Sequence, residues 1–164
     1  MGPRITLFSK LFKNNCIDAY IYRYKKYYIK CSNTKNRFIK SIRKIILNKL
    51  AFKIGIEVEP GILDESTIIY HQNIVINSYA KIGKNVRFHG NNCVGNNGKT
   101  LDAPVIGDNV DIGFGAVIIG GVNIPNNCKI GANAVVISSF YEEGLTIVGN
   151  PAHAVTLKEP KNSI

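Results

Sequence analysis

Two histidines in this 164-residue chain, His71 and His89, have the residue type and spacing for acid–base chemistry. An imidazole titrates near neutral pH and can take a proton from a hydroxyl group. The two histidines are eighteen positions apart, and each follows a residue that the local pattern places toward the interior, Tyr70 and Phe88. We therefore predict that the rings lie one above the other on one edge of the fold, as a candidate general-base region. The alternative is that one or both are polar residues facing solvent.

A six-residue period in the second half of the chain provides the elements that position these histidines. No α-helix has this period, and a lone strand alternates at two residues. A fixed hexapeptide period predicts a β-helix, in which three repeats complete a triangular turn and residues eighteen apart stack on successive turns. The large residues of the period are Ile76, Ile82, Phe88, Val94, Ile106, Ile112, Ile118, Ile124, Ile130 and Val136.

The chain divides into three parts. In residues 1–54 the spacing of apolar residues predicts a basic segment of amphipathic helices, with a break near residues 31–34. Residues 55–155 predict the β-helix domain, and residues 156–164 a polar tail. Within the coil the repeat lapses between Val94 and Ile106, where the Gly- and Asn-rich stretch 95–104 predicts a loop that leaves the coil. The alternative is that this stretch fills two faces in register.

Positive charge is concentrated in the N-terminal segment. Residues 1–53 contain 14 Lys or Arg and one acid, whereas residues 54–164 contain 7 Lys or Arg and 10 acids. Basic helices with interleaved tyrosines suit an anionic membrane surface, although packing at one end of an assembly is the alternative; we expect no nucleic-acid partner. No signal peptide or membrane span is expected, and the cysteines fit neither a zinc site nor a disulfide scaffold. The predicted location is the cytoplasm, with peripheral contact at the inner membrane face.

Four stretches of the chain resemble serine acetyltransferases and related polysaccharide O-acetyltransferases, which are hexapeptide-repeat acyltransferases. These stretches are 71–83, which begins with His71, then 95–100, 112–116 and 149–152. The resemblance covers about residues 55–155. It implies an all-β core, a left-handed parallel β-helix, and a homotrimer with active sites between subunits.

The resemblance also implies the chemistry. Acetyl-CoA is the expected co-substrate and no metal is expected. His71 matches the general base, which takes the proton of an acceptor hydroxyl that attacks the thioester directly. Glu57 matches the carboxylate that orients this ring, because a carboxylate fixes the imidazole tautomer and stabilises the imidazolium. Glu59 is the fallback, and a simple capping role for Glu57 is the alternative.

The cofactor-binding candidates lie along the coil edge that holds the pantetheine arm in this family. Glycines there would let a ligand approach the backbone, and lysines would meet the CoA phosphates. The alternatives are tight coil packing for the small residues and an ordinary solvated surface for the lysines. The candidates are Gly113, Gly115, Gly131, Ala132, Lys99 and Lys129.

The acceptor prediction depends on two departures from the family. Serine acetyltransferases have an Asp where this chain has Tyr70, and a His where it has Ala103. The missing Asp would have met a cationic amino group, so we expect the acceptor to be a hydroxyl of a capsule, exopolysaccharide or O-antigen glycan. Tyr70, His89 and Asn92 are the substrate-binding candidates. Serine O-acetylation in cysteine biosynthesis is the alternative; an inactive trimeric interaction module and a sugar-nucleotide N-acetyltransferase are further rivals.

Overall fold

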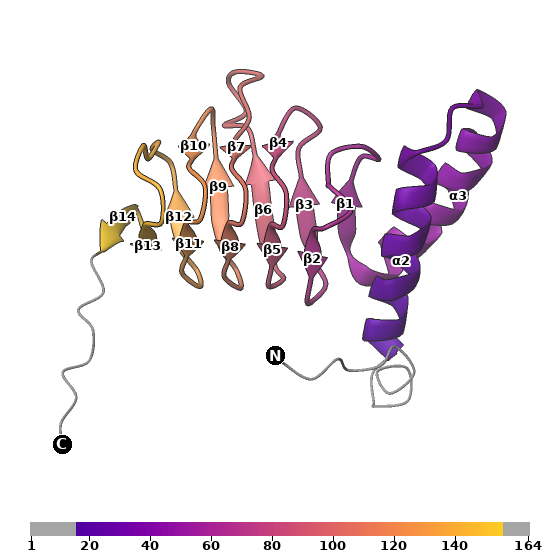
Figure 1. Ribbon diagram of the computed structural model, residues 1–164, viewed down its shortest axis with the longest axis horizontal. Helices are drawn as coiled ribbons and strands as arrows, with labels where there is room; N and C mark the ends of the chain where they lie inside the picture. The colour runs from indigo at the N-terminus through magenta and orange to yellow at the C-terminus, as the bar shows by residue number, and fades with distance from the viewer. Residues whose placement is uncertain (1–15, 156–164) are drawn as a thin grey trace.

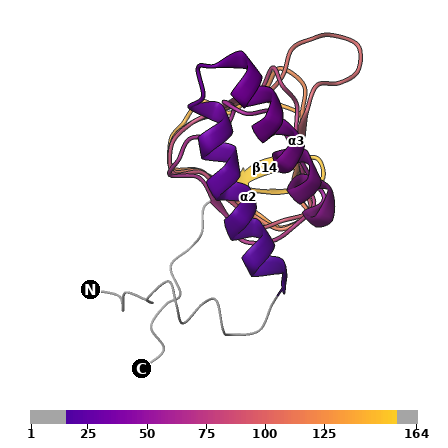
Figure 2. The same ribbon diagram turned by 90° about the vertical axis from the view of Figure 1, so that its right-hand side faces the viewer.

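The computed structural model describes residues 16–155. Two helices, α2 (Cys16–Ser32) and α3 (Arg37–Ile54), lie across one end of a coil of short strands. Figure 2 looks onto this end and shows both helices in front of the coil. No described helix is both long and apolar enough to cross a membrane. The predicted order, helices first and coil second, is confirmed.

The break between the helices, residues 33–36, overlaps the predicted break near residues 31–34, and α3 has a defined start and end. Asn36 caps the N-terminus of α3, since its side-chain oxygen accepts a hydrogen bond from the Ile39 N–H at 3.1 Å. Gly55 ends the helix in the left-handed conformation, at φ 61°, which glycine adopts without steric cost. The chain enters the first strand directly after this residue.

The strands form three sheets that are the faces of a parallel β-helix. The sheet orders are β1-β3-β6-β9-β12, β10-β7-β4 and β14-β13-β11-β8-β5-β2. All pairs are parallel except β13 with β14. The strands are β1 (Ile56–Val58), β2 (Ile68–Ile69), β3 (Ile74–Ile76), β4 (Lys81–Ile82), β5 (Arg87–Phe88), β6 (Asn92–Gly95), β7 (Val105–Ile106), β8 (Asp111–Ile112), β9 (Val117–Ile119), β10 (Asn123–Ile124), β11 (Lys129–Ile130), β12 (Val135–Val136), β13 (Thr146–Gly149) and β14 (Ala152–Val155).

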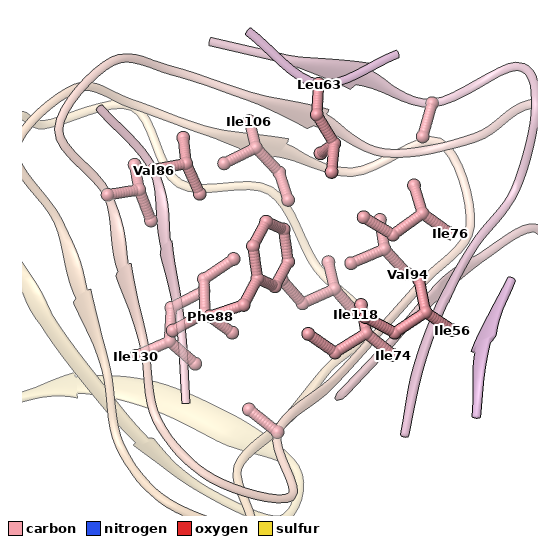
Figure 3. Packing of buried hydrophobic residues seen from close by; sticks show 14 of the residues in the cluster. Ile56, Leu63, Ile74, Ile76, Val86, Phe88, Val94, Ile106, Ile118 and Ile130 are labelled. Carbon is pink, nitrogen blue, oxygen red and sulfur yellow. The ribbon is translucent and has the colours of Figure 1, made fainter. Parts of the chain in front are cut away.

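The large residues of the hexapeptide period fill the interior of the coil. Phe88, Ile112, Ile118 and Ile124 are fully buried, and Figure 3 shows inward side chains from successive turns in contact around Phe88. Burial of such side chains is the main favourable term that holds a coil of two- to four-residue strands together. Nine of the ten large residues are buried and Ile82 is partly buried, so the period predicts most of the core correctly.

Asparagines at the corners of the coil allow the sharp turns between faces. Six of them have a positive φ, a conformation that asparagine tolerates better than most residues. Stacked corners are joined by their side chains: Asn85 donates to Asn109, which in turn donates to Asn127, both at 3.1 Å. These ladders keep successive turns in register.

The stretch between β6 and β7 leaves the coil, as predicted. The partner of Cys93 on the next turn is Val117, twenty-four residues later, instead of the usual eighteen. β7 pairs with β4 on the sheet that follows directly, so residues 96–104 do not form an additional face. Figure 1 and Figure 2 show this loop projecting beyond the other corners.

Candidate active site

His71 lies at a corner of the coil between β2 and β3, near the helical end. Its side chain is exposed, and its ring meets the edge of the Phe114 ring at a centroid distance of 6.5 Å and an interplanar angle of 75°. Gly90 lies directly against it on the next turn, because a Cβ at residue 90 would be 2.6 Å from the His71 Cβ. The imidazole is thus held on one side by two lower turns and open to solvent on another.

The predicted stacking of His71 on His89 is wrong by one position. Ile69 pairs with Phe88, nineteen residues later, so Tyr70 lies over His89, with ring centroids 4.7 Å apart. The register of eighteen resumes at β3, where Ile74 pairs with Asn92. The corner at residues 70–73 therefore contains one residue more than the corner beneath it, residues 89–91. Tyr70 is also 41 % exposed, so it does not point into the core.

His89 is instead part of a charged group that the sequence analysis did not identify. Its Nε2 lies 2.8 Å from Oδ1 of Asp111, and Oδ2 of the same carboxylate lies 3.3 Å from a guanidinium nitrogen of Arg87. Asp111 escaped detection because the loop 96–104 adds six residues between it and Arg87. Only the loop boundary, which places Asp111 on the turn below Arg87, could have revealed the contact.

Glu57 projects from the outer face of β1, where it lines a cavity of about 940 Å³ between α3 and the sheet formed by β1, β3 and β6. It pairs in register with Val75. Within the described residues it makes no hydrogen bond to His71. Glu59, the fallback, forms an ion pair with Lys44 of α3 at 2.9 Å. Orientation of the His71 ring by Glu57 stays a prediction.

The small residues assigned to the CoA edge are closely packed against the turn below them. A Cβ at residue 113 would lie 2.6 Å from the Ala132 nitrogen, and one at residue 131 would lie 2.8 Å from Val148. A Cβ on Gly115 would collide with the Asn133 side chain. Coil packing alone therefore favours small residues at these positions, and contact of these residues with CoA stays a prediction. Lys99, in the loop, and Lys129, on β11, are both exposed.

Asn92 is a structural residue of the coil. Its side chain is buried, accepts a hydrogen bond from the Gly90 N–H at 2.9 Å and donates to the Gly113 carbonyl at 2.8 Å. These contacts hold the corner on which His71 rests, so we leave Asn92 out of the proposed substrate site. Among residues 16–155, no three His, Cys, Asp or Glu side chains are grouped so that they could hold a metal ion.

The fold of the chain is similar to that of a known class of proteins. It superposes on soybean serine acetyltransferase with a TM-score of 0.67 and 25% identity, covering 83% of this chain and 57% of that one. It superposes on the Neisseria gonorrhoeae serine acetyltransferase in complex with serine with a TM-score of 0.65 and 26% identity, covering 84% and 55%. The fold is the left-handed parallel β-helix of hexapeptide-repeat acyltransferases, as predicted.

Sequence comparison names the particular relatives. The chain is 36% identical to the serine acetyltransferase of Staphylococcus xylosus over 118 residues, which are 70% of this chain and 54% of the relative. It is 39% identical to that of Staphylococcus aureus strain N315 over 108 residues, 63% of this chain and 50% of the relative. The chain therefore spans about half the length of the curated relatives it matches. No family model matches it. The predicted resemblance to acetyl-CoA-dependent acyltransferases of this kind is confirmed.

The predicted glycan acceptor is wrong. The relatives found by sequence and by structure are serine acetyltransferases, which was the alternative, and one solved relative holds serine. The prediction gave too much weight to the residues at positions 70 and 103. The carboxylate of Asp111, one turn below His89, shows that a charged group can reach this edge from a position other than 70.

Proposed function

We propose that the chain is an acetyl-CoA-dependent O-acetyltransferase that acts on the hydroxyl of serine. The observation that carries this proposal is the position of His71, exposed at a corner of the coil within the part of the chain that resembles serine acetyltransferases. Gly90 packs closely against the His71 Cβ, and the Phe114 ring contacts the imidazole from the turn below.

The proposed reaction uses the His71 imidazole at this corner as the general base. His71 accepts the proton of the serine hydroxyl as its oxygen attacks the carbonyl carbon of the acetyl thioester. Backbone N–H groups at the coil edge would stabilise the oxyanion of the tetrahedral intermediate. When the C–S bond breaks, the leaving thiolate takes the proton back from the imidazolium. The products are O-acetylserine and CoA, and His71 returns to its starting state.

Serine-dependent release of free thiol from acetyl-CoA tests the proposal. With purified chain we expect thiol release that saturates with L-serine and exceeds the rate without acceptor by more than about 100-fold, since general-base catalysis and positioning both contribute. O-acetylserine should form in equal amount. Release that is the same with and without L-serine would reject serine as the acceptor, and no release at all would support the inactive interaction module.

The active form is proposed to be a homotrimer with its sites between subunits. Support comes from the places of the two proposed partners, since Glu57 is on the outer face of β1 and His71 is at the corner between β2 and β3. Within one chain, no hydrogen bond joins them among the described residues. A neighbouring subunit that covers the outer face of β1, β3 and β6 could supply the missing partner.

The outer face of α3 is proposed to contact an anionic membrane surface. Phe38, Ile45 and Phe52 are 75 %, 59 % and 89 % exposed and recur every seven residues, so they form one apolar stripe. Lys49 and Lys53 are exposed on the same helix. A second copy docked on this stripe would bring like charges together, whereas acidic headgroups would neutralise them.

Vesicle sedimentation tests this contact. The chain should sediment with vesicles that contain phosphatidylglycerol and remain in the supernatant with pure phosphatidylcholine. Lys49→Glu combined with Lys53→Glu should weaken binding about 10-fold or more, because each basic residue near such a surface contributes on the order of 1 kcal/mol. Lys81→Glu, an exposed lysine on β4 of the coil, is the matched control. Equal sedimentation with both vesicle types would contradict the proposal.

A further inference from the structure

Four side chains of the coil form a cluster directly beside the proposed general base. The members are Tyr70, Arg87, His89 and Asp111, which we call the edge cluster. The Tyr70 ring stacks on His89, whose Nε2 contacts Asp111, whose other oxygen contacts Arg87. Tyr70 directly precedes His71 in sequence, and Gly90, which follows His89, touches His71. The cluster and the base are therefore connected through Tyr70–His71 on one turn and His89–Gly90 on the next.

The charge on this face is positive. Arg87, Asp111 and Lys129 occupy register positions on three successive turns, so one carboxylate lies between two cations. Its two oxygens are already in contact with His89 and Arg87, which leaves little capacity to bind a cationic group. The net positive charge of this face therefore favours binding of an anionic group.

The cluster also has unused hydrogen-bonding capacity. Arg87 makes one ionic contact among the described residues, at 3.3 Å through a terminal guanidinium nitrogen, whereas its Nε is buried and has no partner there. His89 uses only Nε2, so Nδ1 has no side-chain partner among the described residues. The side chains of Arg87 and His89 are each 41% exposed, so a ligand beside His71 can reach them. A guanidinium and an imidazolium next to each other suit a carboxylate; His89 must be protonated for this, because Nδ1 of a neutral ring whose Nε2 donates to Asp111 can only accept.

We infer that the edge cluster binds the carboxylate of the acceptor, so that the acceptors of this chain are small molecules carrying both a hydroxyl and a carboxylate. Arg87 and His89 contact the carboxylate, and Asp111 is a positioning residue that holds both of them. This inference depends on the proposed function, because serine is such a molecule. It assigns recognition to the acid group of serine and not to its amino group, for which Tyr70 offers no charge.

A phosphate of CoA is the other anion that could occupy the cluster, but the position argues against it. In CoA the whole pantetheine arm separates the phosphates from the thioester. The thioester must lie next to the hydroxyl that His71 activates, so the phosphates lie at a distance from this corner. An anionic site in direct contact with the residues flanking the base therefore belongs to the acceptor.

Acceptor kinetics of Arg87→Ala and His89→Gln test the inference. Each should raise KM for L-serine about 10- to 100-fold, because each removes a charge-assisted or polar contact to a carboxylate. The KM for acetyl-CoA should change less than about 2-fold, and kcat less than KM. Ethanolamine, which is serine without its carboxylate, should react poorly and equally with all forms. Arg23→Ala, an exposed arginine on α2, is the matched control and should leave every constant unchanged.

Asp111→Asn separates the positioning role from a merely structural one. It should raise KM for L-serine while leaving the thermal unfolding midpoint within about 2 °C of the unsubstituted chain. If KM for acetyl-CoA rises and KM for L-serine does not, the anion is a phosphate and the inference is overturned. Unchanged KM for L-serine in both Arg87→Ala and His89→Gln would overturn it as well. An unsubstituted chain that does not use L-serine would instead reject the proposed function, and the inference with it.

Discussion

His71→Ala is expected to lower serine-dependent thiol release by about 10²- to 10⁴-fold, the usual contribution of a general base. The serine hydroxyl is a weak nucleophile while it keeps its proton, and His71 is exposed at the corner, where it can accept that proton. The loss should appear in kcat, because the imidazole contributes mainly in the transition state. KM for L-serine should change little if the edge cluster binds the acceptor.

Two controls make this result specific. His153→Ala removes an imidazole that is exposed on β14, at the end of the coil away from the helices, and should leave the rate unchanged. His71→Gln keeps a polar side chain of similar size and should be as inactive as His71→Ala, since an amide does not accept the proton. Activity within about 3-fold of the unsubstituted chain in both His71 variants would show that another group acts as the base.

The sequence predicted the coil well because each inward position repeats the same physical requirement. Phe88, Ile112 and Ile130 occupy equivalent places on successive turns, and each must fill the same narrow interior. Asparagine at the corners and glycine under the next turn follow the same period. Local sequence therefore carries the fold without any need for long-range information.

The site was predicted less well because it lies where the period fails. One extra residue at the corner 70–73 replaced the expected His71–His89 stack by contacts of Tyr70 with His89 and of His71 with Gly90. Because the loop 96–104 lengthens one turn, Asp111 is twenty-four residues after Arg87, and a search at a spacing of eighteen residues misses it. Both irregularities move side chains by whole positions, so no pattern that assumes a constant period can place them.

The acceptor was mispredicted for a related reason. A single residue, Tyr70, was read as the loss of a charge that the site needs. Residues on the turns below can instead recognise the acceptor. A comparison of position 70 alone with the family pattern does not take those residues into account. The contacts of Asp111 with Arg87 and His89 join two adjacent turns of the coil. They can be identified only once the register of the strands is known.

The second large effect is expected from Glu57→Gln, which should lower kcat about 10- to 10³-fold through loss of the carboxylate that orients the base. The position of Glu57 also affects which His71 it can orient. Glu57 lines the cavity on the outer side of β1 and makes no hydrogen bond to His71 of its own chain among the described residues. If Glu57 orients the ring, it should do so for the His71 of a neighbouring subunit, so each site would need two chains.

Mixed trimers test whether Glu57 and His71 of one site come from different subunits. Co-expression of a His71→Ala chain with a Glu57→Gln chain should recover about a quarter of full activity when the two residues come from different subunits, because half of the sites keep His71 and half of their neighbours keep Glu57. If both come from one chain, no site is intact and no activity returns. A chain with both substitutions, co-expressed with unsubstituted chain, is the matched control, since it should give about a quarter for residues on different subunits but about half for residues on the same one. Zero recovery in the first mixture together with half activity in the second would place Glu57 and His71 in one subunit, and would mean that the structure changes at this corner when the trimer forms.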